Sequence, residues 1–184
     1  MYTTSSQTIG PYLHIGMTWL VDDNFAPEGV AGERISVGGR MIDGDGAPVT
    51  DAMLEVWQAN AQGKYAHPED TRDLPADERF TGFGRVYTDE NGRFRFTTIK
   101  PGRVPAADGG LQAPHLNVTI FMRGMLKQLV TRLYFDGDAA NERDPVLATV
   151  GQARTQTLIA TRNGNAFEWN VVLQGPGETV FFDI

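Results

Sequence analysis

The feature that most constrains the fold of this 184-residue chain is a series of short stretches in which apolar and polar residues alternate before a turn sequence. In residues 34–42, an apolar or small residue recurs at every second position, and Asp43-Gly44-Asp45-Gly46 follows. A period of two places alternate side chains on opposite faces of a β-strand. Glycines can adopt positive φ without steric penalty and so reverse the chain. The pattern therefore predicts short strands joined by tight turns.

Similar stretches recur along the chain, and the dipeptides Asn91-Gly92 and Asn163-Gly164 favour tight hairpins. Helical periodicity of 3.6 residues is almost absent, and no linker or repeat divides the sequence. We therefore predict one all-β domain over residues 1–184, a β-sandwich of mixed or antiparallel strands. The predicted strands are residues 34–42, 52–58, 84–88, 93–98, 116–122, 129–135, 157–162 and 167–173.

Two segments lack this alternation. Residues 67–80 are rich in charge and proline, so we expect a long surface loop, with room for a turn of helix. Residues 136–150 can hold one short helix that stops before Pro145, because the residue before a proline is disfavoured in helical geometry.

Composition limits the classes of function. Hydrophobic residues make up 41% of the chain, enough for a core, but no stretch reaches the ~20 apolar residues that cross a bilayer. The first six residues lack the basic and apolar regions of a secretory signal, so we expect a cytoplasmic protein with no membrane partner. Cysteine is absent, which excludes disulfides and thiolate sites. The net charge of -7 argues against nucleic acid as a partner.

One motif points to a specific chemistry. Its residues are Gly39, Met41, Gly46, Val49, Leu54, Glu55, Val56, Gly63 and Tyr65. This spacing resembles the signature of the intradiol ring-cleaving dioxygenases, non-haem ferric enzymes that open catechols between their two hydroxyl groups. The resemblance implies a prealbumin-like β-sandwich and a ferric ion held by two tyrosines and two histidines.

Only half of that ligand set is present. Matched by position, Tyr65 takes the place of the first tyrosine and His115 that of the first histidine, whereas Val104 and Asn117 stand where the second tyrosine and second histidine belong. Ferric iron is a hard cation that favours anionic oxygen donors together with imidazole. Val104 has no donor atom and the amide of Asn117 is a neutral, weak ligand. We therefore predict that this chain binds no catalytic iron.

Three segments sharpen the resemblance, namely residues 6–16, 113–124 and 177–184. They are similar to the iron-free subunit of the heteromeric members of this family. The resemblance implies a heterodimer within a larger oligomer, in which an iron-bearing partner subunit holds the ferric ion and most catalytic groups. It also implies a small aromatic substrate that carries a carboxylate. We further expect residues 1–33 to form an N-terminal arm that packs on the partner.

The same resemblance implies no catalytic residue in this chain, but residues that line the substrate pocket across the interface: Thr8, Gly10, Pro11, Tyr12 and Arg123. Their chemistry is suitable. Gly10-Pro11 is rigid and small enough for close approach to a flat ring, and Tyr12 offers an aromatic wall with a hydroxyl. Arg123 can attract a carboxylate.

Four of the residues named above also have a purely structural interpretation. Tyr65 could pack at a strand end, His115 could be a buried histidine with a hydrogen bond and Asn117 its polar neighbour, and Arg123 could form a surface ion pair.

Two other functions remain open. Residues 39–65 followed by 88–94 also resemble transthyretin-like sandwiches that only bind ligands, although the terminal residues 178–184 argue against this reading. A dioxygenase that works alone would need other ligands, with Tyr87 or Tyr134 as candidates.

Overall fold

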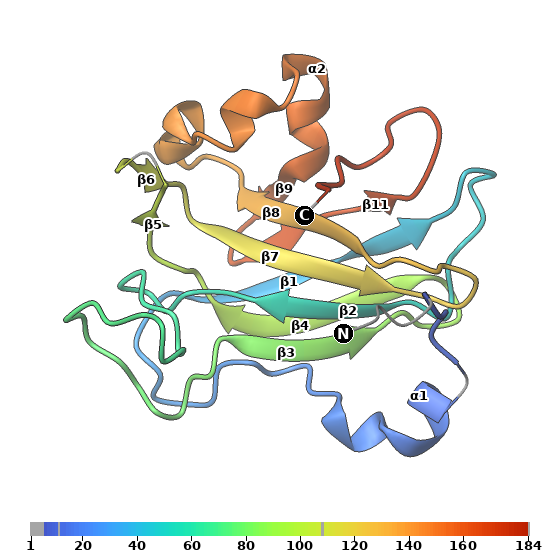
Figure 1. The fold of residues 1–184 in the computed structure, drawn as a ribbon, viewed down its shortest axis with the longest axis horizontal. Coiled ribbons are helices and arrows are strands. Elements are labelled where there is room, and N and C mark those ends of the chain that lie inside the picture. The colour runs from blue at the N-terminus through green and yellow to red at the C-terminus, as the bar shows by residue number, and fades with distance from the viewer. Residues whose placement is uncertain (1–5, 11, 108, 184) are drawn as a thin grey trace.

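Strands dominate the computed structural model, which describes residues 6–10, 12–107 and 109–183 (Figure 1). The strands are β1 (Arg34–Ile42), β2 (Met53–Trp57), β3 (Phe83–Tyr87), β4 (Arg93–Ile99), β5 (Val104–Pro105), β6 (Leu111–Gln112), β7 (His115–Phe121), β8 (Leu129–Phe135), β9 (Ile159–Asn163), β10 (Ala166–Glu168) and β11 (Val171–Val172). Short helical turns complete the structure: α1 (Tyr12–Gly16), η1 (Thr18–Leu20), η2 (Ala139–Arg143), η3 (Leu147–Thr149), α2 (Gln152–Thr155) and η4 (Gln156–Leu158).

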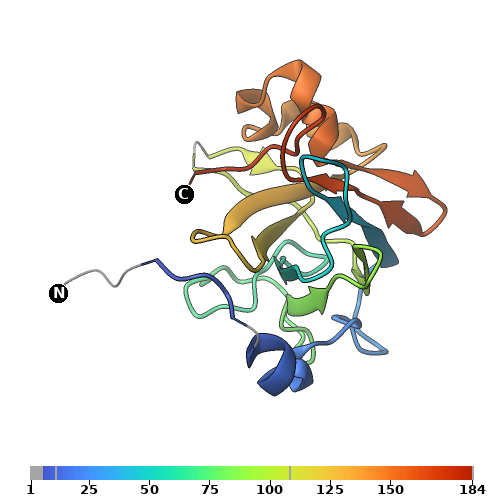
Figure 2. The same cartoon turned by 90° about the vertical axis from the view of Figure 1, so that its right-hand side faces the viewer.

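Nine of the strands in the described part of the chain form one continuous sheet in the order β11-β1-β10-β9-β8-β7-β2-β3, with β4 paired to β1. Pairing is mixed, because β8–β9, β1–β10 and β1–β11 are parallel and the other pairs are antiparallel. The mostly β, mixed-strand fold predicted from the sequence is confirmed. The sheet curls until its two ends approach each other, so the fold is close to a barrel (Figure 2).

The core fills the space inside this curl. Side chains from β1 and β4, such as Val37 and Phe96, join one buried cluster with Leu54 of β2 and with Leu116 and Val118 of β7. Burial of each large apolar side chain stabilises the fold by about 1.5–3 kcal/mol. The alternating residues recognised in the sequence therefore hold the two halves of the sheet together.

The bounds of the predicted strands are close to those observed, except at the last one. Residues 167–173 form two strands, because the chain leaves the sheet at Trp169 and Asn170. Trp169 comes so close to β1 that a Cβ on Gly39 would lie 1.8 Å from its carbonyl oxygen. The Asn170 side chain then accepts a hydrogen bond from the Arg40 N–H at 2.9 Å. The short pair β5–β6 was not predicted.

Both irregular segments are placed by the structure. Residues 67–80 form a loop without a helical turn. The short helix predicted within residues 136–150 is η2, which ends at Arg143, before Pro145. The helical turns between β8 and β9 cover one side of the sheet, and α1 lies on the opposite side (Figure 2). No helix in the described residues has the length and apolar character needed to span a membrane.

Candidate functional site

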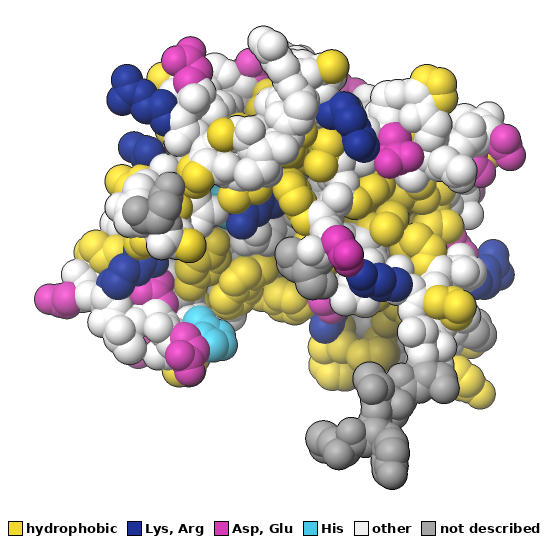
Figure 3. All heavy atoms as spheres, turned by 45° about the horizontal axis from the view of Figure 1, so that its top comes forward, with side chains coloured by type: hydrophobic (Ala, Val, Ile, Leu, Met, Phe, Trp, Pro, Cys, Tyr) yellow, Lys and Arg dark blue, Asp and Glu magenta, His cyan; other side chains and the backbone are white. Residues whose placement is uncertain are grey.

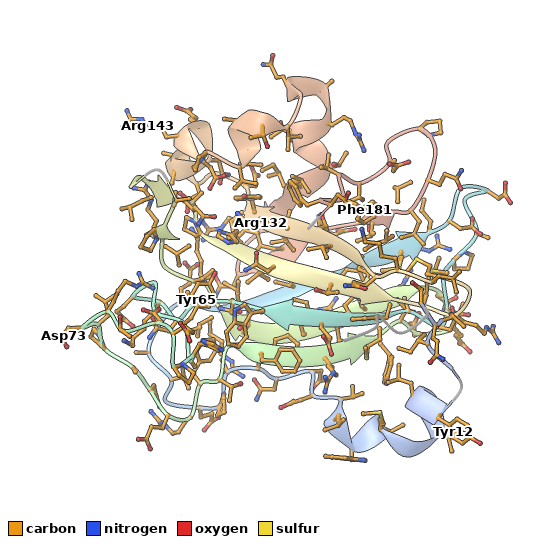
Figure 4. The ribbon with its side chains drawn as sticks, in the orientation of Figure 1. Tyr12, Tyr65, Asp73, Arg132, Arg143 and Phe181 are labelled. Atoms are coloured by element: carbon orange, nitrogen blue, oxygen red, sulfur yellow. The ribbon has the colours of Figure 1, made fainter. Side chains whose placement is uncertain are left out.

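A pocket of about 760 Å³ lies at the end of the sheet where β7 begins. It is enclosed by β2, β8, the β5–β6 pair and the loop that follows β2, and it is lined by Trp57, Tyr65, His67, Glu69, Asp70, Thr71, Arg72, Phe83, Val104, Pro105, Gln112, His115 and Arg132. Figure 4 places Tyr65 and Arg132 at this same end of the molecule, and Figure 3 shows a hollow with apolar side chains on its floor and charged ones at its margin. Three of the four positions that match the iron ligands of the family line this pocket: Tyr65, Val104 and His115.

Tyr65 is held by the loop after β2. Gly63 has φ of +80°, and a Cβ at that position would lie 2.0 Å from the Arg103 carbonyl oxygen, so only glycine fits. The Tyr65 ring stacks on Trp57 with centroids 5.6 Å apart and planes 12° apart. Its hydroxyl is 3.3 Å from the side-chain nitrogen of Asn117. Burial raises the pKa of the Tyr65 phenol, so the group is a neutral phenol in this chain.

His115 is buried at the start of β7, with 3% of its surface exposed. Its Nδ1 lies 2.7 Å from the Ala113 carbonyl oxygen, which can only accept, so Nδ1 carries the proton. Burial, with a smaller contribution from the charge of Arg132, lowers the pKa of His115 to about 4. The imidazole is therefore neutral at pH 7, and the interpretation of His115 as a buried, hydrogen-bonded histidine is confirmed.

The other two ligand positions do not fit a ferric ion. Val104 lies in the pocket wall, where it pairs with Gln112 across β5–β6, and supplies no donor atom. Asn117 directs its amide N–H groups to the Tyr65 hydroxyl and, at 3.4 Å, to the Trp57 carbonyl. A ferric ion would find one phenol and one imidazole here, instead of two anionic phenolates and two imidazoles. The residues present therefore do not match the metal that the family resemblance implies.

Arg132 was missed by the sequence reasoning. It lies on β8, and the antiparallel register places it directly opposite Asn117 of β7. Its guanidinium donates to Gln112 Oε1 at 2.6 Å and to the Tyr134 hydroxyl at 3.3 Å. It forms no ion pair with any acidic residue that the structure describes. The available signal was a lone basic residue inside an otherwise largely apolar strand.

The loop that closes the pocket is fastened by a bidentate ion pair. Arg72 donates to the Asp70 carboxylate through Nε at 2.8 Å and through Nη2 at 2.5 Å. The same Nη2 also donates to the Gly63 carbonyl at 2.7 Å. Asp70 also accepts the backbone N–H of Tyr65 at 2.8 Å. The Arg72 hydrogen bonds hold the pKa of Asp70 below its usual range. This ion pair fixes the position of Tyr65.

A buried carboxylate supports the wall behind His115. Asp144 is 1% exposed and accepts from the Ala113 N–H at 2.7 Å, the Tyr134 hydroxyl at 3.1 Å and the backbone N–H groups of Val146 and Leu147 at 2.9 and 2.8 Å. Burial raises the pKa of Tyr134, so its phenol keeps the proton that it donates.

The geometry does not support Tyr87 or Tyr134 as replacement iron ligands. The Tyr134 hydroxyl is engaged with Asp144. The Tyr87 hydroxyl lies 3.5 Å from the Leu13 carbonyl, on the segment that contains α1. Neither tyrosine completes a ligand set at Tyr65 and His115.

Of the residues expected to line a pocket with the partner, Thr8 and Arg123 lie at the opposite end of β7. Thr8 bridges the turn after this strand, because its hydroxyl accepts from the Gly124 N–H at 2.7 Å and donates to the Met122 carbonyl at 3.5 Å. Arg123 Nε lies 3.1 Å from Asp51, and its side chain is 78% exposed. Gly10 is exposed, Tyr12 on α1 is 81% exposed, and Pro11 falls outside the described residues. Thr8 and Arg123 are thus brought together, about 20 Å from the pocket along the strand.

Comparison with known proteins identifies the family of this chain. The family model described as Dioxygenase matches residues 22–175. The protocatechuate 3,4-dioxygenase alpha chain of Burkholderia cepacia is 42% identical over 98% of this chain and 97% of that protein. The beta chain from the same organism is 40% identical over 80% of this chain and 67% of its own length. The structure of the intradiol ring-cleavage dioxygenase from Tetranychus urticae covers 83% of this chain and 86% of its own at 20% identity, with a TM-score of 0.67, and shows the shared fold.

Proposed function

This chain belongs to the dioxygenase family, and from that premise we propose that it is the iron-free alpha chain of a protocatechuate 3,4-dioxygenase. The observation that carries the proposal is the identity of 42% with an alpha chain over 98% of the sequence, in a chain whose metal positions include Val104 and Asn117. The holoenzyme cleaves protocatechuate with dioxygen to 3-carboxy-cis,cis-muconate, in aromatic catabolism by the β-ketoadipate pathway. This chain alone is inactive.

The ferric ion of the holoenzyme is bound by the beta chain, with which this chain forms a heterodimer within a larger oligomer. The donor set here supports that division, since it offers two of the four ligands that ferric iron needs. The cytoplasmic location expected from the sequence remains a prediction. We also propose that the two facing halves of the curled sheet act as the layers of a prealbumin-like sandwich.

The contribution of this chain is the positioning of substrate across the interface. Thr8, Gly10, Pro11 and Tyr12 belong to an arm over residues 1–33 that packs on the beta chain. Exposed apolar side chains on the described part of the arm support this, because Tyr12, Ile15 and Trp19 are each more than 70% exposed. Arg123 adds positive charge for the carboxylate of the substrate.

Iron content and visible absorbance test the proposal, measured on this chain alone and after co-expression with a beta chain. We expect the lone chain to be colourless and inactive, and the complex to show tyrosinate-to-iron charge transfer and to cleave protocatechuate. A lone chain that is coloured and active would refute the assignment. A transthyretin-like binding module would leave the complex without activity.

A further inference from the structure

The pocket at the start of β7 keeps a cation and an aromatic wall although its metal positions are lost. We propose that it is a metal-free binding site for a single-ring aromatic carboxylate, which contacts Arg132 through the carboxylate and the Trp57–Tyr65 wall through the ring. No part of this inference depends on the proposed function, because every residue of the site belongs to this chain.

The charge of Arg132 is available to a ligand. Its protein partners, Gln112 and the Tyr134 hydroxyl, are both neutral. Of the two acidic side chains in the pocket wall, Asp70 is occupied by its bidentate contact with Arg72, and Glu69 is exposed at the margin. A guanidinium that is partly buried and lacks a carboxylate partner favours a ligand that carries one, and its planar fork suits two parallel hydrogen bonds.

The wall of the pocket suits a flat ring. Trp57 and Tyr65 stack at 5.6 Å, and Phe83 lies 6.5 Å from Trp57 with 37% of its surface exposed. Aromatic rings favour offset or edge contacts with such surfaces. The volume of about 760 Å³ lies within the usual range for small-molecule sites of about 300–1,000 Å³.

The residues at the two lost ligand positions, Val104 and Asn117, determine which class of ligand the pocket favours. Val104 contributes apolar surface where a metal-binding site would need an anionic donor, and Asn117 is already hydrogen-bonded to Tyr65. A neutral catechol would therefore find no metal to chelate. An aromatic acid would find a cation that compensates its charge and apolar surface for its ring.

The test is equilibrium dialysis of radiolabelled benzoate against the purified complex of this chain with its beta chain. Arg132→Gln removes the cation, and Gln112→Glu places a carboxylate beside Arg132 without removing it. Arg143→Gln is the matched control, because Arg143 is an exposed arginine of η2, outside the residues that line the pocket (Figure 4). We expect both pocket variants to lose one bound benzoate per alpha–beta pair, or to bind it at least tenfold more weakly, and the control to match the wild type.

Equal stoichiometry and affinity in all four complexes would overturn the proposal. If Arg132→Gln does not assemble, Gln112→Glu decides the question. Turnover of protocatechuate by the wild-type complex is measured separately and tests the proposed function. Should that function fail, dialysis of the full-length chain without a partner still tests the pocket, with one benzoate per chain expected and none in Gln112→Glu.

Discussion

The two ends of β7 differ in how their polar side chains are satisfied. At the start of the strand, His115 is buried and its neighbours form a closed network with Asp144 and Tyr134. Beyond its other end, Arg123 is 78% exposed and Tyr12 on the nearby arm is 81% exposed. Buried polar groups must find partners within the fold, whereas exposed apolar side chains indicate contact with another molecule. The polar groups around His115 are satisfied within the chain, whereas the exposed arm end is the part that we propose packs against a partner.

This difference also separates two kinds of residue in one domain. Substitutions at the pocket end should act on the isolated chain, by changing its folding, its ligand binding or, where they restore the missing ligands, its ability to hold metal. Substitutions at the arm end should leave folding intact and act only in the assembled enzyme.

The largest effect is expected from restoring the ligand set with Val104→Tyr and Asn117→His together. Val104 lines the same pocket as Tyr65 and His115, and Asn117 is hydrogen-bonded to Tyr65. The double variant would therefore offer two phenolates and two imidazoles. We expect about one iron per chain, with visible tyrosinate-to-iron absorbance, measured by metal analysis and spectroscopy. The control pair Val104→Phe and Asn117→Gln adds bulk without ligands and should stay colourless. A folded double variant without iron would mean that the pocket has diverged beyond these two positions.

The next largest effect is expected for Asp144→Ala. The substitution leaves the Tyr134 hydroxyl and three backbone N–H groups without their acceptor in a buried site. Unsatisfied buried donors cost about 1–3 kcal/mol each, so the free energy of unfolding should fall by at least about 3 kcal/mol. Urea unfolding of the chain measures this, with the 90%-exposed Asp183 changed to Ala as the control. A loss no greater than in the control would show that the network behind His115 is not structural.

A smaller loss, about 2 kcal/mol near pH 7, is expected for Asp70→Asn, because the variant breaks a partly buried, bidentate ion pair. Since the folded pKa of Asp70 is depressed, its contribution is present above about pH 4 and disappears as the pH falls through the folded value. The two unfolding curves should therefore converge in acid. Asp77→Asn is the matched control, because Asp77 pairs with Arg79 in the same way at a more exposed position. A gap that is constant with pH would contradict the assigned role of the charge.

The sequence predicts strands well where alternation ends in a turn, as the observed bounds of β1 and β8 show. The resemblance to the intradiol dioxygenases also predicted that Tyr65, Val104, His115 and Asn117 share one site, because the four match the ligand positions of that family. Arg132 could not be assigned from sequence alone, since only the register of β7 with β8 makes it a neighbour of Asn117. The interruption at Trp169 depends on close approach to Gly39, which is 130 residues away along the chain. Such contacts between distant segments leave no local pattern.

The smallest effect on stability is expected for Arg123→Ala. Its ion pair with Asp51 is largely exposed, and such pairs contribute about 0–1 kcal/mol, so unfolding of the chain should change by less than about 0.5 kcal/mol. In the assembled enzyme, however, loss of the cation should raise the KM for protocatechuate at least about threefold while the iron content stays the same. Lys127→Ala is the control, since Lys127 is another exposed cation between β7 and β8, paired instead with Asp183. An equal KM in both variants would remove the substrate role from Arg123. A loss of iron on changing Arg123 would mean that this end of the chain acts on the metal of the partner, which would break the separation between the two ends.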